Sequence, residues 1–188
     1  MEGDFQMDII ELKTPSPEYA ADIWQFRQEI LEKDEGSKDQ FAGCGGLESS
    51  ASAEEWIERT KLGESEENCE DGKVPSHMYL AVRKADNRIV GLIDLRHHID
   101  HPVLGTWGGH SGYSVCPSER GHGYAKEMLR QLLPKAGALG IRKFLITCKV
   151  GNLASEKTIL ANGGVFDGIV DGNGEKIKRF WITIDPEK

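Results

Sequence analysis

Hydrophobic positions in the first third of the chain recur mainly at the spacing of helices. Residues 9–12 form a short apolar run that predicts a strand. Between residues 16 and 31 the apolar side chains follow one helical stripe. Ser52-Ala53-Glu54-Glu55 is a capping box, which predicts the start of a second helix. The glycine-rich stretch 36–50 and the acidic stretch 63–72 predict loops after the two helices.

From residue 76 onward the pattern changes to short apolar runs separated by turn residues, which is typical of strands. Helical spacing returns only at 123–137 and 153–161. Pro134 lies inside the first of these helices, so we expect a kink or an early end there. The strands are predicted at Met78–Val82, Ile89–Leu95, His110–Val115, Phe144–Val150, Val165–Val170 and Ile177–Ile184.

This order of elements, β-α-α-β-β-β-α-β-α-β-β, predicts an α+β fold in a single domain, residues 1–188. Antiparallel hairpins flank one strand–helix–strand crossover, so we expect a mixed and mostly antiparallel sheet. The prediction is a sheet of about seven strands flanked by about four helices.

Composition and charge narrow the classes of function. With 23 basic and 31 acidic residues the net charge is −8, which argues against nucleic acid as a partner. No apolar run approaches the roughly 20 residues that cross a bilayer. Residues 1–10 lack the features of a signal peptide, so we expect a cytoplasmic protein without a membrane partner. The four cysteines form no CxxC pair and are interpreted as free thiols, and we expect no metal site.

A glycine turn at the start of the third helix is the first candidate for chemistry. Gly121 and Gly123 lie between a predicted strand and a predicted helix, and without side chains there, backbone N–H groups can approach an anion closely. Arg120 adds a cation that can pair with the same anion. The segment is neither a Walker A loop nor a GxGxxG fingerprint. The turn favours a phosphate or diphosphate ligand without identifying it.

The surrounding residues resemble a known family. Val115-Cys116-Pro117-Ser118-Glu119-Arg120-Gly121-His122-Gly123-Tyr124-Ala125 is similar to the acetyl-CoA-binding motif of the GNAT superfamily of N-acetyltransferases, matched at Arg120, Gly123 and Ala125. Residues 147–155 resemble the family's next strand and its Asn-x-x-Ala/Ser helix start, and residues 163–166 resemble its Gly-Phe turn. The resemblance extends from about Met78 to Phe166, whereas the first 75 residues match only in element order.

The resemblance implies a GNAT-type fold with acetyl-CoA as co-substrate. Residues 76–188 would form the acetyl-CoA-binding core, and residues 1–75 would frame the acceptor. The acceptor would be a primary amine of a small molecule or peptide, and a homodimer could form along an exposed final strand. Backbone groups of β-strand residues Tyr113, Ser114 and Val115 would pair with the pantetheine arm. The diphosphate would lie against Arg120, Gly121, His122, Gly123, Tyr124, Ala125 and Lys126, with Asn152 and Ser155 on the far side of the ligand.

The proton-transfer groups depart from the commonest pattern of this family. Many members carry a tyrosine seven positions after the asparagine, and counting from Asn152 gives Ile159. His110 is the candidate base, because an imidazole titrates near neutral pH; the alternative is a histidine that only packs or hydrogen-bonds. Asp94 and Arg96 share one face of a strand, where they either bind the acceptor or are solvated. A non-catalytic acyl-CoA-binding module therefore stays open beside the enzyme.

Overall fold

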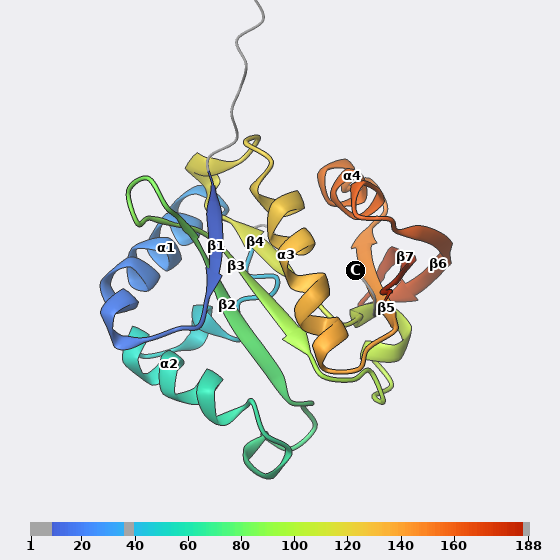
Figure 1. Cartoon of the computed structure of the whole chain (residues 1–188), viewed down its shortest axis with the longest axis horizontal. Helices are drawn as coiled ribbons and strands as arrows, with labels where there is room; N and C mark the ends of the chain where they lie inside the picture. Colours follow the sequence, from blue (N-terminus) through green and yellow to red (C-terminus); the bar gives the residue numbers. More distant parts are fainter. Residues whose placement is uncertain (1–8, 36–39, 186–188) are drawn as a thin grey trace, which may run out of the picture.

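The described part of the chain forms seven strands in two sheets, with helices packed between and around them (Figure 1). The computed structural model describes residues 9–35 and 40–185. The strands are β1 (Ile10–Lys13), β2 (Ser76–Arg83), β3 (Ile89–Arg96), β4 (Tyr113–Val115), β5 (Lys143–Lys149), β6 (Val165–Gly172) and β7 (Glu175–Thr183). The α-helices are α1 (Ala20–Lys33), α2 (Ala53–Leu62), α3 (Tyr124–Ala138) and α4 (Leu153–Ala161). The predicted α+β class with about seven strands is confirmed, although the strands are divided between two sheets.

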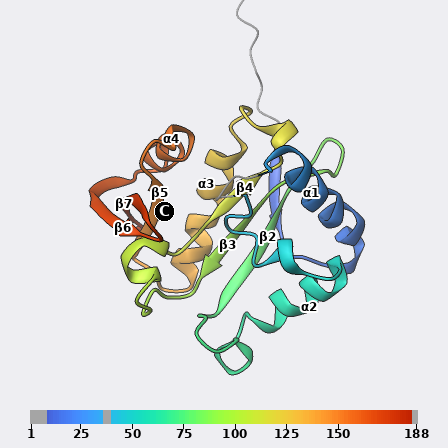
Figure 2. The same ribbon diagram turned by 180° about the vertical axis from the view of Figure 1, so that it is seen from behind.

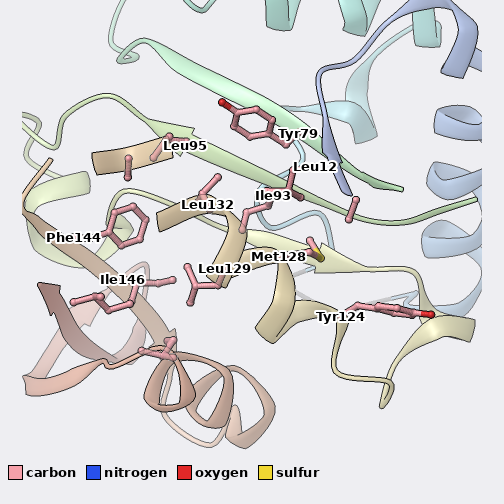
Figure 3. Packing of buried hydrophobic residues seen from close by; sticks show 14 of the residues in the cluster. Leu12, Tyr79, Ile93, Leu95, Tyr124, Met128, Leu129, Leu132, Phe144 and Ile146 are labelled. Carbon is pink, nitrogen blue, oxygen red and sulfur yellow. The ribbon is translucent and has the colours of Figure 1, made fainter. Parts of the chain in front are cut away.

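The first sheet has the strand order β1-β2-β3-β4, and all of its pairs are antiparallel. Alternate side chains of its strands point to opposite faces. Helices α1 and α2 cover one face of this sheet (Figures 1 and 2). Leu80 and Leu92 of the sheet pack there with Trp56 of α2 in one buried cluster. Ile93 packs with Leu132 in the cluster that α3 forms on the other face (Figure 3). Both faces of this sheet are therefore covered, and its strands are buried.

The second sheet has the order β5-β7-β6, again with antiparallel pairs. Helix α4 lies beside it, and Lys178 of β7 pairs with Glu156 of α4 at 2.7 Å. The final strand β7 is the central strand of this sheet, so the expectation that its edge is exposed is wrong. Among the described strands, β5 and β6 form the two edges of this sheet, and Phe166 and Ile169 of β6 are exposed.

The two sheets meet where the chain enters β4. The backbone N–H of His110 donates to the carbonyl of Leu145 in β5 at 2.8 Å. Beyond this junction β4 and β5 belong to different sheets. Helix α3 packs between the two sheets, and its residues Met128 and Leu129 belong to the core that both sheets share (Figures 1 and 3). The periodicity of the sequence predicts the strands, but it carries no information on which strands separate.

Two expected elements differ in their bounds. Strand β4 covers only Tyr113–Val115 instead of 110–115, because the regular ladder with β3 breaks before Tyr113: the Gly112 N–H donates to the Asp94 side chain, and the His110 N–H donates to β5. Helix α3 continues past Pro134 to Ala138, so the helix does not end early. Pro134 is exposed, and water can bond the carbonyl that lacks the proline N–H.

Two expectations drawn from composition, on the cysteines and on membrane-spanning helices, can be compared with the structure. Cys44, Cys69, Cys116 and Cys148 are free thiols. The Cys116 thiol donates to Glu29 at 3.0 Å, and burial raises its pKa to about 11, which fits an unreactive thiol. In the described ranges no helix has the length and apolar character to cross a membrane. The expectations on residues 1–8, and on residues 36–39 of the first loop, lie outside these ranges.

Candidate functional site

A cavity of about 740 Å³ opens between β4, the start of α3, β5 and α4. Its volume lies within the range of small-molecule sites, roughly 300–1,000 Å³. Every residue predicted to bind the cofactor lines this cavity except His122, which is exposed beside it. The lining residues that were predicted are Tyr113, Ser114, Val115, Arg120, Gly121, Gly123, Tyr124, Ala125, Lys126, Asn152 and Ser155.

Strand β4 presents one edge of its backbone to this cavity. On the β3 side the ladder uses alternate residues: Asp94 donates its N–H to the Gly112 carbonyl at 3.2 Å, and Cys116 donates to Val90 at 2.8 Å. Hydrogen-bonding groups of an antiparallel strand alternate between its two edges. The backbone groups of Tyr113 and Val115 therefore point away from β3, toward the edge where no described strand is paired. An extended ligand can add to such an edge as a further strand.

The start of α3 supplies the anion-binding part of the lining. Gly121 and Gly123 have φ values of 84° and 83°, in the left-handed region that glycine adopts without strain. Gly123 caps the helix, so the backbone N–H groups at the helix start have no carbonyl partner within the helix. These groups and the helix dipole favour a negative charge at this position, and the exposed side chain of Lys126 adds a positive one.

Arg120 lies at the cavity but pairs with an acidic side chain. Its guanidinium binds both carboxylate oxygens of Asp34, the residue after α1, with one distance of 2.8 Å. Its Nε donates to the Val115 carbonyl at 3.3 Å, and the hydrogen bond to Asp34 raises the pKa of Arg120. The arginine therefore fastens the glycine turn to α1, and the expected direct pairing of Arg120 with a phosphate is not what this arrangement favours.

A second part of the cavity lining comes from turns that were not predicted from the sequence to belong to the site. Trp107 lies on the π-helical turn η4 (Leu104–Gly108), whose backbone is held by Thr147: the hydroxyl donates to the Trp107 carbonyl at 2.7 Å. The hairpin between β6 and β7 packs on this ring, because a Cβ at Gly172 would lie 2.5 Å from the Trp107 Cγ. Glu175, at the start of β7, pairs with Lys149 of β5 at 2.6 Å. Only tertiary packing brings these turns together, so no sequence spacing signals them.

His110 lies outside the cavity lining and is used by the fold. Its side chain is only 4% exposed, and its ring stacks on Phe144 with centroids 5.0 Å apart. Its Nδ1 accepts a hydrogen bond from the Leu145 N–H at 2.9 Å, and burial lowers its pKa to about 4. A neutral imidazole in this state carries its proton on Nε2, so it offers no lone pair to a substrate. The packing interpretation of His110 fits this geometry, and the base interpretation does not.

Replacing His110 with alanine is expected to destabilise the protein, whereas His110→Asn keeps an acceptor for the Leu145 N–H and retains activity. The unfolded chain binds a proton at this side chain near pH 6.5 and the folded chain only near pH 4. Acidification through this window therefore lowers the stability of the wild type by on the order of 3 kcal/mol, at about 1.36 kcal/mol per pKa unit. Thermal unfolding between pH 7 and pH 4 should show a smaller loss in His110→Asn. An asparagine variant without activity but with normal stability would restore His110 as the base.

A pair of hydroxyl groups lies against the cavity between β4 and α4. The Tyr113 hydroxyl and the Ser155 Oγ are 2.7 Å apart. Burial raises the pKa of Tyr113 to about 12, so its proton is retained at neutral pH. Asn152 caps α4 by accepting from the Ser155 N–H at 3.1 Å, which fixes the serine at the helix start. The pair is a source of a hydroxyl proton beside the β4 edge.

Within the part of the chain that the structure describes, no cluster of three or more His, Cys, Asp or Glu side chains is arranged to hold a metal ion. His97 and His77 contact each other through ring nitrogens 2.7 Å apart. Burial is the main cause that lowers the pKa of His97, and the neighbouring His77 adds to it.

Comparison with known proteins identifies a family model and several similar folds. Residues 10–165 match the family described as Acetyltransferase (GNAT) domain. RimL, the ribosomal L7/L12 alpha-N-protein acetyltransferase in complex with coenzyme A, aligns over 94% of this chain and 95% of its own at 22% identity, with a TM-score of 0.64. The microcin C7 self immunity acetyltransferase MccE, in complex with acetyl-CoA and AMP, aligns over 96% and 94% at 20% identity, with a TM-score of 0.66.

A spermidine N-acetyltransferase from Vibrio cholerae, in complex with CoA and spermine, aligns over 93% of this chain and 95% of its own at 14% identity, with a TM-score of 0.59. No curated protein matches the sequence significantly. At these identities the solved structures establish a shared fold.

Proposed function

The chain belongs to the acetyltransferase (GNAT) domain family, and from that premise we propose that it transfers an acetyl group from acetyl-CoA to a primary amine of a small molecule or peptide. Family membership makes it an acyl-CoA-dependent N-acetyltransferase, and it confirms the resemblance carried by residues 115–125. One observation carries the proposal: a single cavity combines the anion-binding start of α3 with the open backbone edge of β4.

The donor occupies the part of the cavity formed by β4, α3 and α4. Its diphosphate rests on the backbone N–H groups that follow Gly121 and Gly123, with Lys126 nearby. Its pantetheine arm extends along Tyr113 and Val115, where a backbone N–H polarises the thioester carbonyl. Asn152 and Ser155 face the arm from α4. Two solved structures with similar folds are described with CoA or acetyl-CoA bound, which supports acetyl-CoA as the donor.

The acceptor amine attacks the thioester directly, within a complex of both substrates, so the enzyme must hold the two together and move two protons. An ammonium has no lone pair, and a base must first remove its proton. Among the carboxylates of the lining, Asp34 and Glu119 pair with arginines at the donor end of the cavity, whereas Glu175 pairs with Lys149 at 2.6 Å on the opposite wall. We assign the base to Glu175, directly or through one water, because it lies on the wall formed by the β6–β7 hairpin.

The departing thiolate requires a proton in turn. Ile159, at the position where many family members have tyrosine, is fully buried in the core and does not line the cavity. The hydroxyl pair of Tyr113 and Ser155 faces the donor arm instead. It supplies this proton and regains one when the nitrogen of the tetrahedral intermediate releases its second proton. The missing tyrosine at position 159 therefore does not by itself argue for a non-catalytic module.

The acceptor side draws on both parts of the chain. Ala42 and Gly43 come from the first 75 residues, and Trp107 and Glu175 come from the core. This origin supports the division into an acceptor-framing part and a donor-binding core in one domain. Neighbouring folds are described as acting on a ribosomal protein or on spermidine, which supports an amine acceptor.

The test is turnover with acetyl-CoA and a panel of primary amines that includes peptides with free N-termini and polyamines. Release of free CoA thiol should depend on both substrates and on protein concentration. Acetyl-CoA binding by calorimetry without turnover on any amine would support the alternative, a non-catalytic acyl-CoA-binding module. A thermal shift with ATP but none with CoA would contradict both interpretations.

A further inference from the structure

Asp94 and Arg96 on β3 hold the segment that joins the two walls of the cavity. The segment covers residues 108–112 and runs from the turn that carries Trp107 to the first residue of β4. The sequence allows two roles for these side chains, binding the acceptor or facing solvent. In the structure they pair with each other, with Arg96 Nη2 at 3.0 Å from Asp94 Oδ2.

Asp94 binds the end of this segment next to β4. Its side chain is buried, with the residue 6% exposed, and its Oδ1 accepts from the Gly112 N–H at 2.6 Å. The N–H of Asp94 donates to the Gly112 carbonyl at 3.2 Å. In a regular antiparallel pair the two backbones exchange both hydrogen bonds. Here a carboxylate replaces one carbonyl, so the chain leaves the regular ladder immediately before Tyr113.

Arg96 binds the rest of the segment. Its Nη1 donates to the carbonyls of Gly108 at 3.1 Å and Gly109 at 3.0 Å, and its backbone N–H donates to the His110 carbonyl at 2.8 Å. Three consecutive carbonyls therefore depend on one residue. A guanidinium forks between such acceptors in a fixed plane, which an ammonium cannot reproduce.

The backbone of this segment has little room to adjust. Gly109 has a φ of 71°, and a Cβ there would lie 2.7 Å from the Leu145 carbonyl oxygen. A Cβ at Gly112 would lie 2.8 Å from the Gly43 nitrogen. Because the segment lies against both neighbours, the contacts made by Asp94 and Arg96 select one conformation of a chain that is otherwise rich in glycine.

We propose that Asp94 and Arg96 are a positioning pair that sets the distance between the Trp107 wall and the β4 edge, and thereby the rate of transfer rather than the binding of the donor. This inference rests on the proposed function. The backbone N–H groups at the start of α3, which hold the diphosphate, are built without these two side chains, and the segment that they hold ends before Tyr113, so we expect the Kd of acetyl-CoA to change much less than the rate. A displacement of about 1 Å between reacting groups can cost on the order of 100-fold in rate.

The central variant is Arg96→Lys, which keeps the positive charge beside Asp94 but loses the fork. Arg59→Lys is the matched control: Arg59 on α2 also binds two consecutive loop carbonyls, those of Gly45 and Gly46, at 3.0 Å each, and it does not line the cavity. We expect Arg96→Lys to lower kcat by about tenfold or more with a much smaller change in the Kd for acetyl-CoA. Arg59→Lys should leave kcat unchanged.

Asp94→Asn tests the other half of the pair, because its amide oxygen still accepts from the Gly112 N–H while the charge is lost. Since both side chains hold one segment, the effects of Asp94→Asn and Arg96→Lys on kcat should be less than additive in the double variant. Equal losses of kcat in Arg96→Lys and Arg59→Lys, or fully additive losses in the double variant, would overturn the proposal.

Amide hydrogen exchange separates this proposal from the proposed function, because it needs no turnover. Faster exchange confined to residues 108–113 in Arg96→Lys supports the positioning role even for a protein that acetylates no amine tested. Unchanged exchange in that segment would overturn it. Absence of turnover in the wild type would instead count against the proposed function alone.

Discussion

Replacing Glu175 with glutamine is expected to slow acetyl transfer by about 100- to 10,000-fold, the range that a positioned general base contributes. Glutamine preserves the size of the side chain but removes the negative charge that accepts the proton of the acceptor ammonium. The side chain belongs to the hairpin wall rather than to the diphosphate site at the start of α3, so the Kd of acetyl-CoA should stay unchanged. Steady-state rates with a saturating amine, combined with calorimetry of acetyl-CoA binding, give both quantities.

Glu156→Gln is the matched control for this experiment. Glu156 also pairs with a lysine, Lys178 at 2.7 Å, but it lies outside the cavity lining. Its substitution removes an ion pair of the same kind, and we expect the rate to remain within about twofold of the wild type because such pairs contribute little, about 0–1 kcal/mol, when partly exposed. A Glu175→Gln enzyme that keeps its full kcat would exclude Glu175 as the base. Loss of activity in both variants would indicate damage to the fold.

Substituting valine for Gly123 should weaken acetyl-CoA binding by about 10- to 100-fold. A residue with a Cβ in the left-handed region costs about 1–2 kcal/mol, and a β-branched residue is especially unfavourable there. To relieve this strain the turn must leave its φ of 83°, which redirects the N–H groups at the start of α3. Titration of the variant with acetyl-CoA, followed by calorimetry, measures the loss.

Gly140→Val separates strain from binding. Gly140 follows the other end of α3 with a φ of 84°, and no atom lies within 4 Å of a Cβ built there. Both variants should therefore lose similar thermal stability, while only Gly123→Val loses acetyl-CoA affinity. Equal affinities in the two variants would contradict the placement of the diphosphate at the start of α3.

The donor side of the site could be predicted from the sequence because its parts are contiguous. A strand end, two glycines and a helix start within residues 115–126 already define where backbone N–H groups converge. Asn152 and Ser155 were expected at the site from the family resemblance, and in the structure they are joined by a local helix cap. The role of Arg120 was less predictable, because its partner Asp34 is distant in sequence and lies at the end of another helix.

The acceptor side could not be predicted, since it is assembled from separate turns. Trp107 lies on the turn before β4 and Glu175 lies at the start of β7, and they share a wall only because Gly172 leaves room for the indole ring. His110 has the chemistry of a base, but its Nδ1 is already bonded to the Leu145 N–H. Residue type alone does not reveal such a bond. The division of the strands into two sheets is equally non-local, because it depends on the short β4 and on the junction at His110.

The diphosphate site at residues 121–126 is made of main-chain N–H groups, whereas the opposite wall of the cavity is made of side chains on turns. A change of side chain at an exposed position of the diphosphate site leaves its N–H groups in place, and a change on the hairpin alters the pocket directly. Under the proposed function, enzyme engineering can therefore treat the two substrates as separate problems. A library confined to Trp107 and to Asn173, which lines the cavity from the turn between β6 and β7, would retarget the enzyme to new amines while the acetyl donor stays the same.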